Sequence, residues 1–287
     1  MKVDFHVHST ASDGTLSPSE LALMARGFSA LALTDHDNMD GVEECRAACA
    51  EAGVPFVPGV ELSIEPGEGF DKFHLLALGV DTENAAFKAL LRRILDGRNG
   101  RNRRILENFR NCGIAMDDSI FGYAHGEVLA RPHFARWLMD HGYVQSVKEG
   151  FDRYLLPDSP EETRCYEERW HPPQEEAFRT VHEAGGLCIM AHPKYWRRAW
   201  KQSGPEFAVA ESGLAALKER GLDGVEAIYQ ANTLRETVEF TRMAAKVGLL
   251  VSAGSDFHGG NKPTIPLGMD VAEDTIRPLL SRLNLWA

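Results

Sequence analysis

Histidines and acidic residues recur at the ends of short apolar runs along this chain. The earliest run, DFHVH (residues 4–8), carries His6 and His8 one residue apart, and Asp13 follows five residues after the second histidine. Residues i and i+2 of a β-strand point to the same side, so the two imidazoles are expected to project together. Two imidazoles that project together can take adjacent positions on one metal ion.

Six of the seven strands that we predict carry a histidine or an acid at or next to an end. A lone histidine in a strand is more often an ordinary buried side chain, but nine residues at corresponding positions indicate a metal centre. The set lacks thiolates and suits Mn²⁺, Zn²⁺ or Fe²⁺. At about three to four ligands per ion, nine residues would serve two or three ions, and we favour three. The predicted metal ligands are His6, His8, Asp13, His36, Glu61, His74, His192, Asp256 and His258.

The charge of such a centre predicts its chemistry. Three carboxylates against three divalent ions leave a local charge of about +3, which can hold a phosphate dianion. The formal net charge of the whole chain is −11, which argues against sequence-independent binding along a nucleic-acid backbone. The ligand set therefore favours phosphoester chemistry on a small or locally bound substrate.

The elements that must position these residues are buried strands that alternate with helices. The apolar runs cover 3–8, 30–37, 54–63, 73–80, 186–193, 223–229 and 248–258. The alternation predicts an α/β fold built from βα units, in which seven strands form a closed or nearly closed barrel with its site at one rim. The link between Glu61 and His74 contains Pro and Gly without a helical period, which favours a hairpin that brings these two residues side by side.

The middle of the chain has a different pattern. Strand signals vanish between residues 81 and 181 and helical periodicity takes over, so we expect an inserted helical lobe in a barrel made of residues 1–80 and 182–287. Seven arginines lie between Arg92 and Arg110, and such a run is either a solvated helix face or a clamp for an anion.

Cysteine usage and hydropathy indicate in which cellular compartment the protein resides. Five cysteines without a CxxC pair indicate neither a zinc–thiolate site nor a disulfide framework, so we expect a reducing compartment. No apolar run approaches the length of a membrane span, and His6 stands too near the start for a cleavable signal peptide. We therefore expect a cytoplasmic protein without membrane attachment, and no protein partner is evident.

The motifs HVHSTASDG, TDHD, GVELS, FHLLALG, AHP and GSDFHG, in this order, resemble the polymerase and histidinol phosphatase (PHP) family of metal phosphoesterases. This resemblance implies a distorted seven-stranded (β/α) barrel with three ions, usually Mn²⁺, and attack on phosphorus by a metal-bound hydroxide. Asp4, Asp35 and Asp37 are expected to orient ligand histidines. By motif, one ion would be held by His6, His8, Glu61 and Asp256, a second by Glu61, His74 and His192, and a third by Asp13, His36 and His258, with His36 alternatively contacting the substrate phosphate.

The lobe segments RNRRILENFRNCGI and ARPHFARWL resemble one branch of this family, the nucleoside 3′,5′-bisphosphate phosphatases that also act as 5′-to-3′ exoribonucleases on short RNA. This implies a nucleotide such as 3′-phosphoadenosine 5′-phosphate as substrate, with short RNA as a further one. A second phosphate needs its own cationic site. The predicted substrate-binding residues are Arg98, Arg101, Arg131, His133 and Lys194.

Some alternatives stay open on the sequence alone. The leaving group could be protonated by a metal-bound water, by His36 or by Lys194. A histidinol-phosphate-type monophosphatase would use the same metals but leave the arginine run unexplained. An amidohydrolase or deaminase shares the barrel and the HxH motif, and a non-catalytic module would be expected to have lost ligands, of which none is missing.

Overall fold

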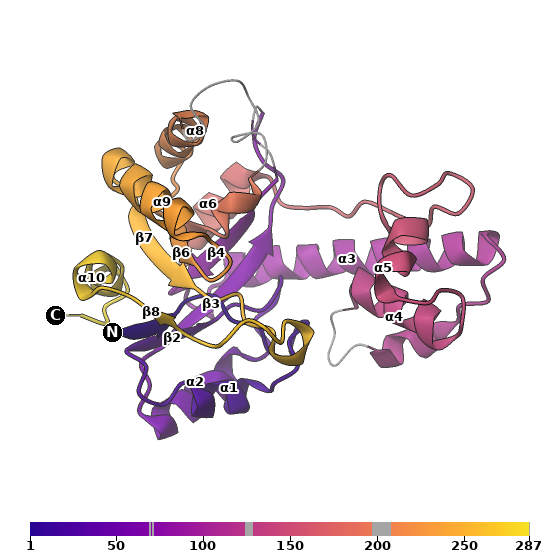
Figure 1. Ribbon diagram of the computed structural model, residues 1–287, viewed down its shortest axis with the longest axis horizontal. Coiled ribbons are helices and arrows are strands. Elements are labelled where there is room, and N and C mark those ends of the chain that lie inside the picture. The colour runs from indigo at the N-terminus through magenta and orange to yellow at the C-terminus, as the bar shows by residue number, and fades with distance from the viewer. Residues whose placement is uncertain (69, 71, 124–128, 197–207, 287) are drawn as a thin grey trace. The chain divides into compact units, whose positions relative to one another are not determined.

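A computed structural model describes residues 1–286 with the exception of 69, 71, 124–128 and 197–207 (Figure 1). The chain forms two compact units, one made of Met1–Leu91 and Pro172–Ala287 and the other of Arg92–His171. No described helix is long and apolar enough to cross a membrane.

The first unit is built on one sheet, in which the predicted strands are found. The described residues add an eighth strand that the sequence did not predict, because its two residues are too few to show a periodic pattern. Along the sheet the order is β7-β6-β5-β4-β3-β2-β1-β8. The strands are β1 (Lys2–Asp4), β2 (Ala30–Leu33), β3 (Phe56–Ser63), β4 (His74–Leu78), β5 (Leu187–Met190), β6 (Gly224–Tyr229), β7 (Leu250–Gly254) and β8 (Met269–Asp270).

Strand β4 runs against both of its neighbours, which makes the barrel irregular. It pairs antiparallel with β3 and with β5, whereas the pairs β1–β2, β2–β3, β5–β6 and β6–β7 are parallel. The predicted hairpin is therefore confirmed, with Ser63 opposite His74. Because β4 is reversed, His74 at its start lies at the same rim as the residues that follow the parallel strands.

The segments that follow β1 and β7 nearly close the barrel. The Phe5 amide donates to the Ala253 carbonyl and the Asp256 amide to the His6 carbonyl, both at 2.9 Å. Val7 and Phe257 form a parallel bridge between them. This seam brings two distant segments that carry histidines and acids side by side.

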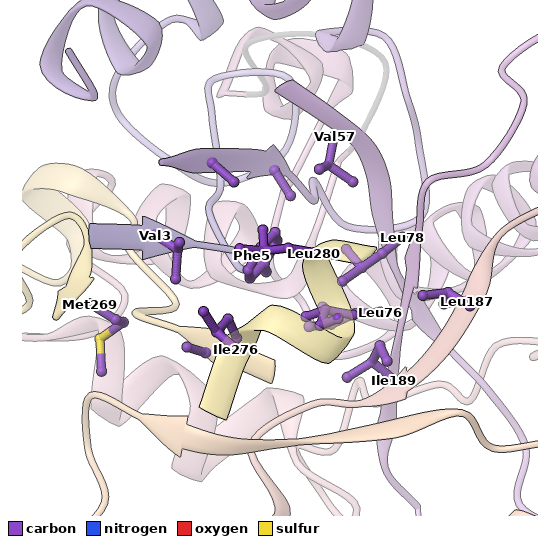
Figure 2. Close-up of a cluster of buried hydrophobic side chains, with 14 of the residues drawn as sticks. Val3, Phe5, Val57, Leu76, Leu78, Leu187, Ile189, Met269, Ile276 and Leu280 are labelled. Atoms are coloured by element: carbon purple, nitrogen blue, oxygen red, sulfur yellow. The ribbon is translucent and has the colours of Figure 1, made fainter. Parts of the chain in front are cut away.

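Helices pack against the sheet. α1 (Pro18–Met24) begins with a capping box formed by Ser17 and Glu20. Val3, Phe5, Leu76 and Ile189 form one buried apolar cluster with Ile276 and Leu280 of the last helix (Figure 2). The remaining helices of this unit are α2 (Val42–Ala52), α6 (Gln174–Glu183), α8 (Ala208–Glu219), α9 (Leu234–Val247) and α10 (Glu273–Arg282).

The second unit is helical and has its own core. α3 (Ala85–Asn111) begins in the first unit and continues into this one, where Ile105 and Phe109 pack with Phe134 and Leu155. Its other described elements are η1 (Asp118–Tyr123), α4 (Arg131–Asp140), α5 (Val147–Gly150) and η2 (Phe151–Leu155).

Candidate metal centre

The carboxylate of Glu61, on β3, lies at the centre of a group of histidines. Its side chain is 1% exposed. One oxygen, Oε1, is 2.8 Å from His74 Nδ1 and 3.0 Å from His192 Nε2, and the other, Oε2, is 2.8 Å from His36 Nδ1. Glu61 therefore presents its two oxygens to different imidazoles, as a carboxylate shared between two ions would.

Asp256 brings a second carboxylate to the histidines of the first motif. Its Oδ1 lies 3.6 Å from His6 Nε2, 3.5 Å from His8 Nε2 and 3.4 Å from His258 Nδ1. The same Nε2 atoms of His6 and His8 lie 3.4 Å and 3.3 Å from the oxygens of Glu61. Both imidazoles thus face the space between two carboxylates.

The other oxygen of Asp256 is held by two groups that the sequence did not single out. Tyr229 donates its hydroxyl to Oδ2 at 3.0 Å, and Lys262 Nζ lies 2.6 Å from the same atom. Lys262 follows the GSDFHG motif by a short turn, so its position near the motif was the available signal. These contacts leave Oδ1 as the oxygen that faces the histidines.

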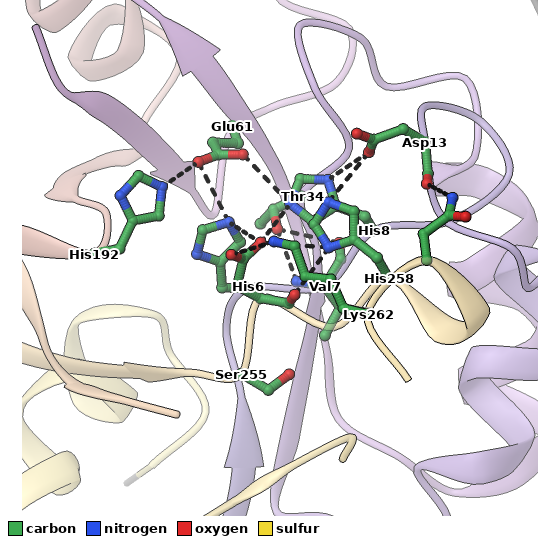
Figure 3. Close-up of polar contacts among 12 residues, drawn as sticks. His6, Val7, His8, Asp13, Thr34, Glu61, His192, Ser255, His258 and Lys262 are labelled. Atoms are coloured by element: carbon green, nitrogen blue, oxygen red, sulfur yellow. Dashed lines mark hydrogen bonds and ion pairs between the residues drawn. The ribbon is translucent and has the colours of Figure 1, made fainter. Parts of the chain in front are cut away.

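Asp13 completes the cluster from the loop after the first motif. Its Oδ1 is 3.3 Å from His258 Nε2 and 3.8 Å from His8 Nδ1, and its Oδ2 is 3.7 Å from His36 Nε2. Figure 3 shows the imidazoles turned toward the Asp13 and Glu61 carboxylates. The structure thus brings together all nine residues that the sequence nominated, His6, His8, Asp13, His36, Glu61, His74, His192, Asp256 and His258.

The chemistry of this cluster fits divalent metal ions. Among the described residues, His6 Nε2, His8 Nε2 and Glu61 Oε2 are buried atoms that form no hydrogen bond of good geometry, although Glu61 Oε2 lies 2.8 Å from His36 Nδ1. Buried polar atoms are normally hydrogen-bonded, so atoms of this kind in a histidine–carboxylate cluster indicate a bound cation. Among the described residues of the cluster, three groups have ligand atoms close enough for one ion: His6, His8 and Glu61; His36, Glu61 and His74; His8, Asp13, His36 and His258.

Two histidines of the first motif take up protons readily in the absence of metal. Burial would lower the pKa of His6, but the carboxylates of Glu226, Glu61 and Asp256 outweigh burial and raise this pKa well above 6.5. The pKa of His8 is raised to about 9, again against burial, by the nearby carboxylates of Asp256 and Glu61. A cation that binds here replaces these protons.

The three acids of the cluster stay ionised. Burial opposes ionisation of Glu61, but the surrounding imidazoles hold its pKa well below the usual range. The same balance lowers the pKa of Asp13 and of Asp256. His258 differs, because burial and the charge of His8 lower its pKa below 6.5.

Backbone strain is concentrated at the rim. Four described residues other than glycine have a positive φ angle, and three of them follow strands that end at the cluster. These are Asp37 at 58°, His192 at 28° and Asp256 at 59°. Such conformations cost about 1–3 kcal/mol each and persist where a functional arrangement requires them.

The role of Asp4 and Asp35 in orienting ligand histidines stays a prediction: in the hydrogen bonds of the described residues neither acid contacts an imidazole ring, but Asp4 accepts the backbone amide of His6 at 3.2 Å. The Asp35 carboxylate accepts hydrogen bonds from the amide and hydroxyl of Ser9 and from the hydroxyl of Ser12. Asp4 accepts from the amide and hydroxyl of Ser255 and from backbone amides, and burial raises its pKa to about 6 against these bonds. The turns beyond the strand ends leave amides without backbone partners, and the two acids satisfy those amides instead of imidazole rings.

Glu226, in the interior of β6, contacts the cluster although the sequence reasoning passed over it. Its Oε1 is 2.9 Å from His6 Nδ1, and its Oε2 accepts the backbone amide of His192 at 2.6 Å. The side chain is fully buried. A single acid inside an otherwise apolar strand was the signal that could have revealed it.

Lys194 lies away from the predicted ligands. Its Nζ donates to the carbonyl of Ala231 and lies 3.3 Å from Glu236 Oε2, so it ties the turn η3 (Pro193–Tyr195) to the start of α9. Among the described residues, Lys194 makes no polar contact with the nine clustered side chains.

Three of the predicted arginines lie close together in the second unit. Arg98 and Arg101 are 6% and 5% exposed. Burial and the guanidinium groups of Arg98, Arg169 and Arg131 lower the pKa of Arg101 to about 9. Its Nε donates to Asn102 Oδ1 at 3.0 Å, whereas its buried Nη2 finds no hydrogen-bond acceptor among the residues that the structure describes.

Arg131 and His133, which are also predicted to bind substrate, make contacts within the unit. Arg131 donates to the Leu155 carbonyl at 3.3 Å and stands over the Tyr166 ring at 5.4 Å. His133 accepts the Ala130 amide through Nδ1 at 3.0 Å, at the start of α4.

Comparison with known proteins places this fold and cluster in a class. The model of the PHP domain family matches residues 4–108. A 3′,5′-nucleoside bisphosphate phosphatase of Chromobacterium violaceum is 34% identical over 99% of this chain and 95% of its own length. A 5′-3′ exoribonuclease of Haemophilus influenzae is 34% identical over 90% of each chain. The chain belongs to the PHP family, which confirms the resemblance seen in its motifs.

The three-dimensional comparison agrees with the family. A solved structure from Chromobacterium violaceum, described as an amidohydrolase with bound sulfate and no metal, matches with a TM-score of 0.80 and 32% identity. The match covers 98% of this chain and 97% of that one. The predicted barrel fold is thereby confirmed, and the family together with the names of both relatives confirms the predicted class of phosphoric ester hydrolase.

Proposed function

We propose that this protein is a metal-dependent phosphoesterase that removes the 3′-phosphate from nucleoside 3′,5′-bisphosphates and also degrades short RNA from its 5′ end. The observation that carries the proposal is the buried cluster around Glu61, in which imidazole nitrogens and a carboxylate oxygen form no well-aligned hydrogen bond with any described residue. The substrate class is supported by the names of the two relatives.

The proposed centre holds three Mn²⁺ ions, with Zn²⁺ or Fe²⁺ as substitutes. Ions bound there acidify water for attack on phosphorus and neutralise the phosphate oxygens. Glu61 supports the sharing of ligands, because its two oxygens face different histidines. We assign His6, His8, Glu61 and Asp256 to one ion, Glu61, His74 and His192 to a second, and Asp13, His36 and His258 to a third.

The protein's own groups prepare this centre. Tyr229 and Lys262 hold one oxygen of Asp256 and so direct the other at the histidines. Of the two residues predicted for proton transfer, His36 lies in the cluster and its side chain is 23% exposed, so it can meet a substrate. Lys194 is engaged with Ala231 and Glu236 and is the weaker candidate.

The second phosphate of the substrate is assigned to the lobe (residues 81–181), while the barrel (1–80 and 182–287) supplies the metal centre. Arginine binds phosphate through two parallel hydrogen bonds. The buried Nη2 of Arg101 has no acceptor in the described part of the chain, which supports an anionic ligand at this place. We assign this phosphate to Arg98, Arg101, Arg131 and His133.

The test is a phosphate-release screen with Mn²⁺. It compares 3′-phosphoadenosine 5′-phosphate, AMP, histidinol phosphate and a short 5′-phosphorylated RNA. We expect the highest kcat/KM on the bisphosphate, nucleotide release from the RNA, and little turnover of the two monophosphates. A best rate on histidinol phosphate would overturn the proposed substrate.

A parallel assay addresses the amidohydrolase alternative, because a matching structure carries that description. Amides and nucleobases are offered to the same Mn²⁺-loaded protein and ammonia release is measured. We expect none above the metal-only blank. Ammonia release faster than phosphate release would replace the phosphoesterase assignment.

A further inference from the structure

We propose that Glu226 is a positioning residue of the metal centre, which holds one ligand histidine by its ring and another by its backbone. This inference rests on the proposed function, since it concerns residues assigned there as metal ligands. Glu226 lies in β6, is fully buried and belongs to none of the three proposed ligand sets.

The ring of His6 is oriented by Glu226. Glu226 Oε1 is 2.9 Å from His6 Nδ1, which leaves Nε2 as the nitrogen directed at the cluster. That Nε2 lies 3.4 Å from Glu61 Oε1 and 3.6 Å from Asp256 Oδ1, and it forms no hydrogen bond with the residues described. A carboxylate on the far nitrogen fixes the tautomer and raises the basicity of a metal-binding imidazole.

The backbone of His192 is fixed by the other oxygen. Glu226 Oε2 accepts the His192 amide at 2.6 Å, at a residue whose φ angle is 28°. The hydrogen bond stabilises this strained backbone, and the strained backbone places His192 Nε2 3.0 Å from Glu61 Oε1. One buried carboxylate thus links ligands that we assign to two different ions.

Gly254, on the neighbouring strand β7, leaves the space that this arrangement needs. A Cβ atom at position 254 would lie 2.2 Å from Glu226 Oε1 and 2.4 Å from the Cβ of His6. Both distances are far below van der Waals contact, and the backbone on this side of β6 cannot move away freely because Tyr229 pairs with Gly254. The absence of a side chain here is therefore a requirement of the His6–Glu226 contact.

The test measures Mn²⁺ binding directly. Wild-type protein and Glu226→Gln are freed of metal with a chelator and titrated with Mn²⁺, and free Mn²⁺ is followed by its EPR signal. The amide keeps the size of the side chain but turns one of its two acceptors into a donor, so it cannot accept from both the His192 amide and a protonated His6 Nδ1. We expect Mn²⁺ affinity to fall about 10- to 100-fold.

The matched control is Asp223→Asn. Asp223 directly precedes the same strand, and its carboxylate contacts His182 and the Cys188 amide instead of the proposed ligands. We expect its Mn²⁺ affinity to equal that of the wild type. Thermal unfolding in the presence of chelator shows whether each variant folds without metal. If Glu226→Gln does not fold, Glu226→Asp takes its place, because the shorter side chain keeps the charge but reaches less far.

Gly254→Ala tests the same contact without removing a polar group, and we expect it to weaken Mn²⁺ binding in the same direction. If the wild type binds no Mn²⁺, the proposed function fails. If the wild type binds and the folded Glu226 variants bind equally well, the metal centre stands and the positioning role is wrong.

Discussion

The barrel and the lobe both bury charged side chains, but they do so in opposite ways. In the barrel, the acids Asp13, Glu61 and Asp256 are surrounded by imidazoles. The positive charge and the hydrogen bonds of these histidines stabilise the ionised carboxylates and so lower the pKa of all three acids. In the lobe, the charge of Arg101 is disfavoured by burial and by neighbouring guanidinium groups, which lower its pKa to about 9.

This difference indicates what each region binds. A buried charge is costly unless it is paired, and a cluster with ionised acids and protonatable histidines is completed by cations that replace the protons. A cluster of guanidinium groups is completed by an anion. The charge of each region therefore supports the metal ions proposed for the barrel and the phosphate proposed for the lobe, and each variant below acts on one of these regions.

The largest effect is expected for Glu61→Gln, which removes the acid that contacts the most imidazoles in the barrel. Losing the charge shared between two proposed ions should lower kcat/KM about 10³-fold, since metal charge contributes several kcal/mol to such reactions. Phosphate release and Mn²⁺ content are measured together. Glu65→Gln is the control, because Glu65 is half-exposed and pairs with Lys72; equal metal content in wild type and Glu61→Gln would contradict the assignment.

The second largest effect is expected from a change of pH, which acts on Mn²⁺ binding in the barrel. The pKa of His8 is raised from 6.5 to about 9 in the metal-free fold, so its contribution to stability, on the order of 3 kcal/mol, is complete below about pH 6.5 and lost as the pH rises through 9. Mn²⁺ must displace this proton, so the loss of the His8 proton alone should raise the Mn²⁺ affinity about 50-fold from pH 7 to pH 9. EPR titration at each pH measures this rise, and an affinity independent of pH would show that His8 loses no proton on binding.

The nine clustered residues could be predicted from sequence because they are marked locally. Ligand-type side chains at strand ends, such as His6 and His8, combine with a barrel topology that brings strand ends to one rim. The hairpin that joins Glu61 to His74 was also readable, from Pro and Gly in a link without helical period.

What the sequence did not reveal depends on contacts across the fold. Glu226 acts between strands, and nothing near it in the chain indicates that His6, 220 residues away, is its partner. Lys194 follows a ligand motif but turns to Glu236 on α9, because a long flexible side chain takes the nearest acceptors. Asp4 and Asp35 accept hydrogen bonds from the backbone amides of Ser255 and Ser9. The sequence does not show that these amides lack a backbone acceptor, because this depends on the conformation of the turns.

Arg101→Met tests the lobe. Losing charge-assisted hydrogen bonds to the second phosphate should lower kcat/KM for the bisphosphate about 10- to 100-fold, and leave AMP and Mn²⁺ binding unchanged. Removing a crowded buried charge should also leave the stability of the ligand-free protein unchanged or raise it by about 1 kcal/mol. Arg103→Met, an exposed arginine on the same helix, is the control; equal losses on AMP and on the bisphosphate would argue against a site for a second phosphate.

The smallest effect is expected for Lys194→Met. This variant tests whether the barrel site uses a cationic side chain in addition to metal ions. The amino group of Lys194 ties η3 to α9 through Ala231 and Glu236, so its loss should cost about 1 kcal/mol of stability and change kcat/KM less than about threefold. Lys218→Met, whose amino group also bonds a backbone carbonyl, at Val247, is the control. If Lys194→Met instead lowers kcat/KM about 100-fold at unchanged stability, Lys194 leaves Glu236 to bind the phosphate, and phosphate binding by side-chain cations is then no longer confined to the lobe.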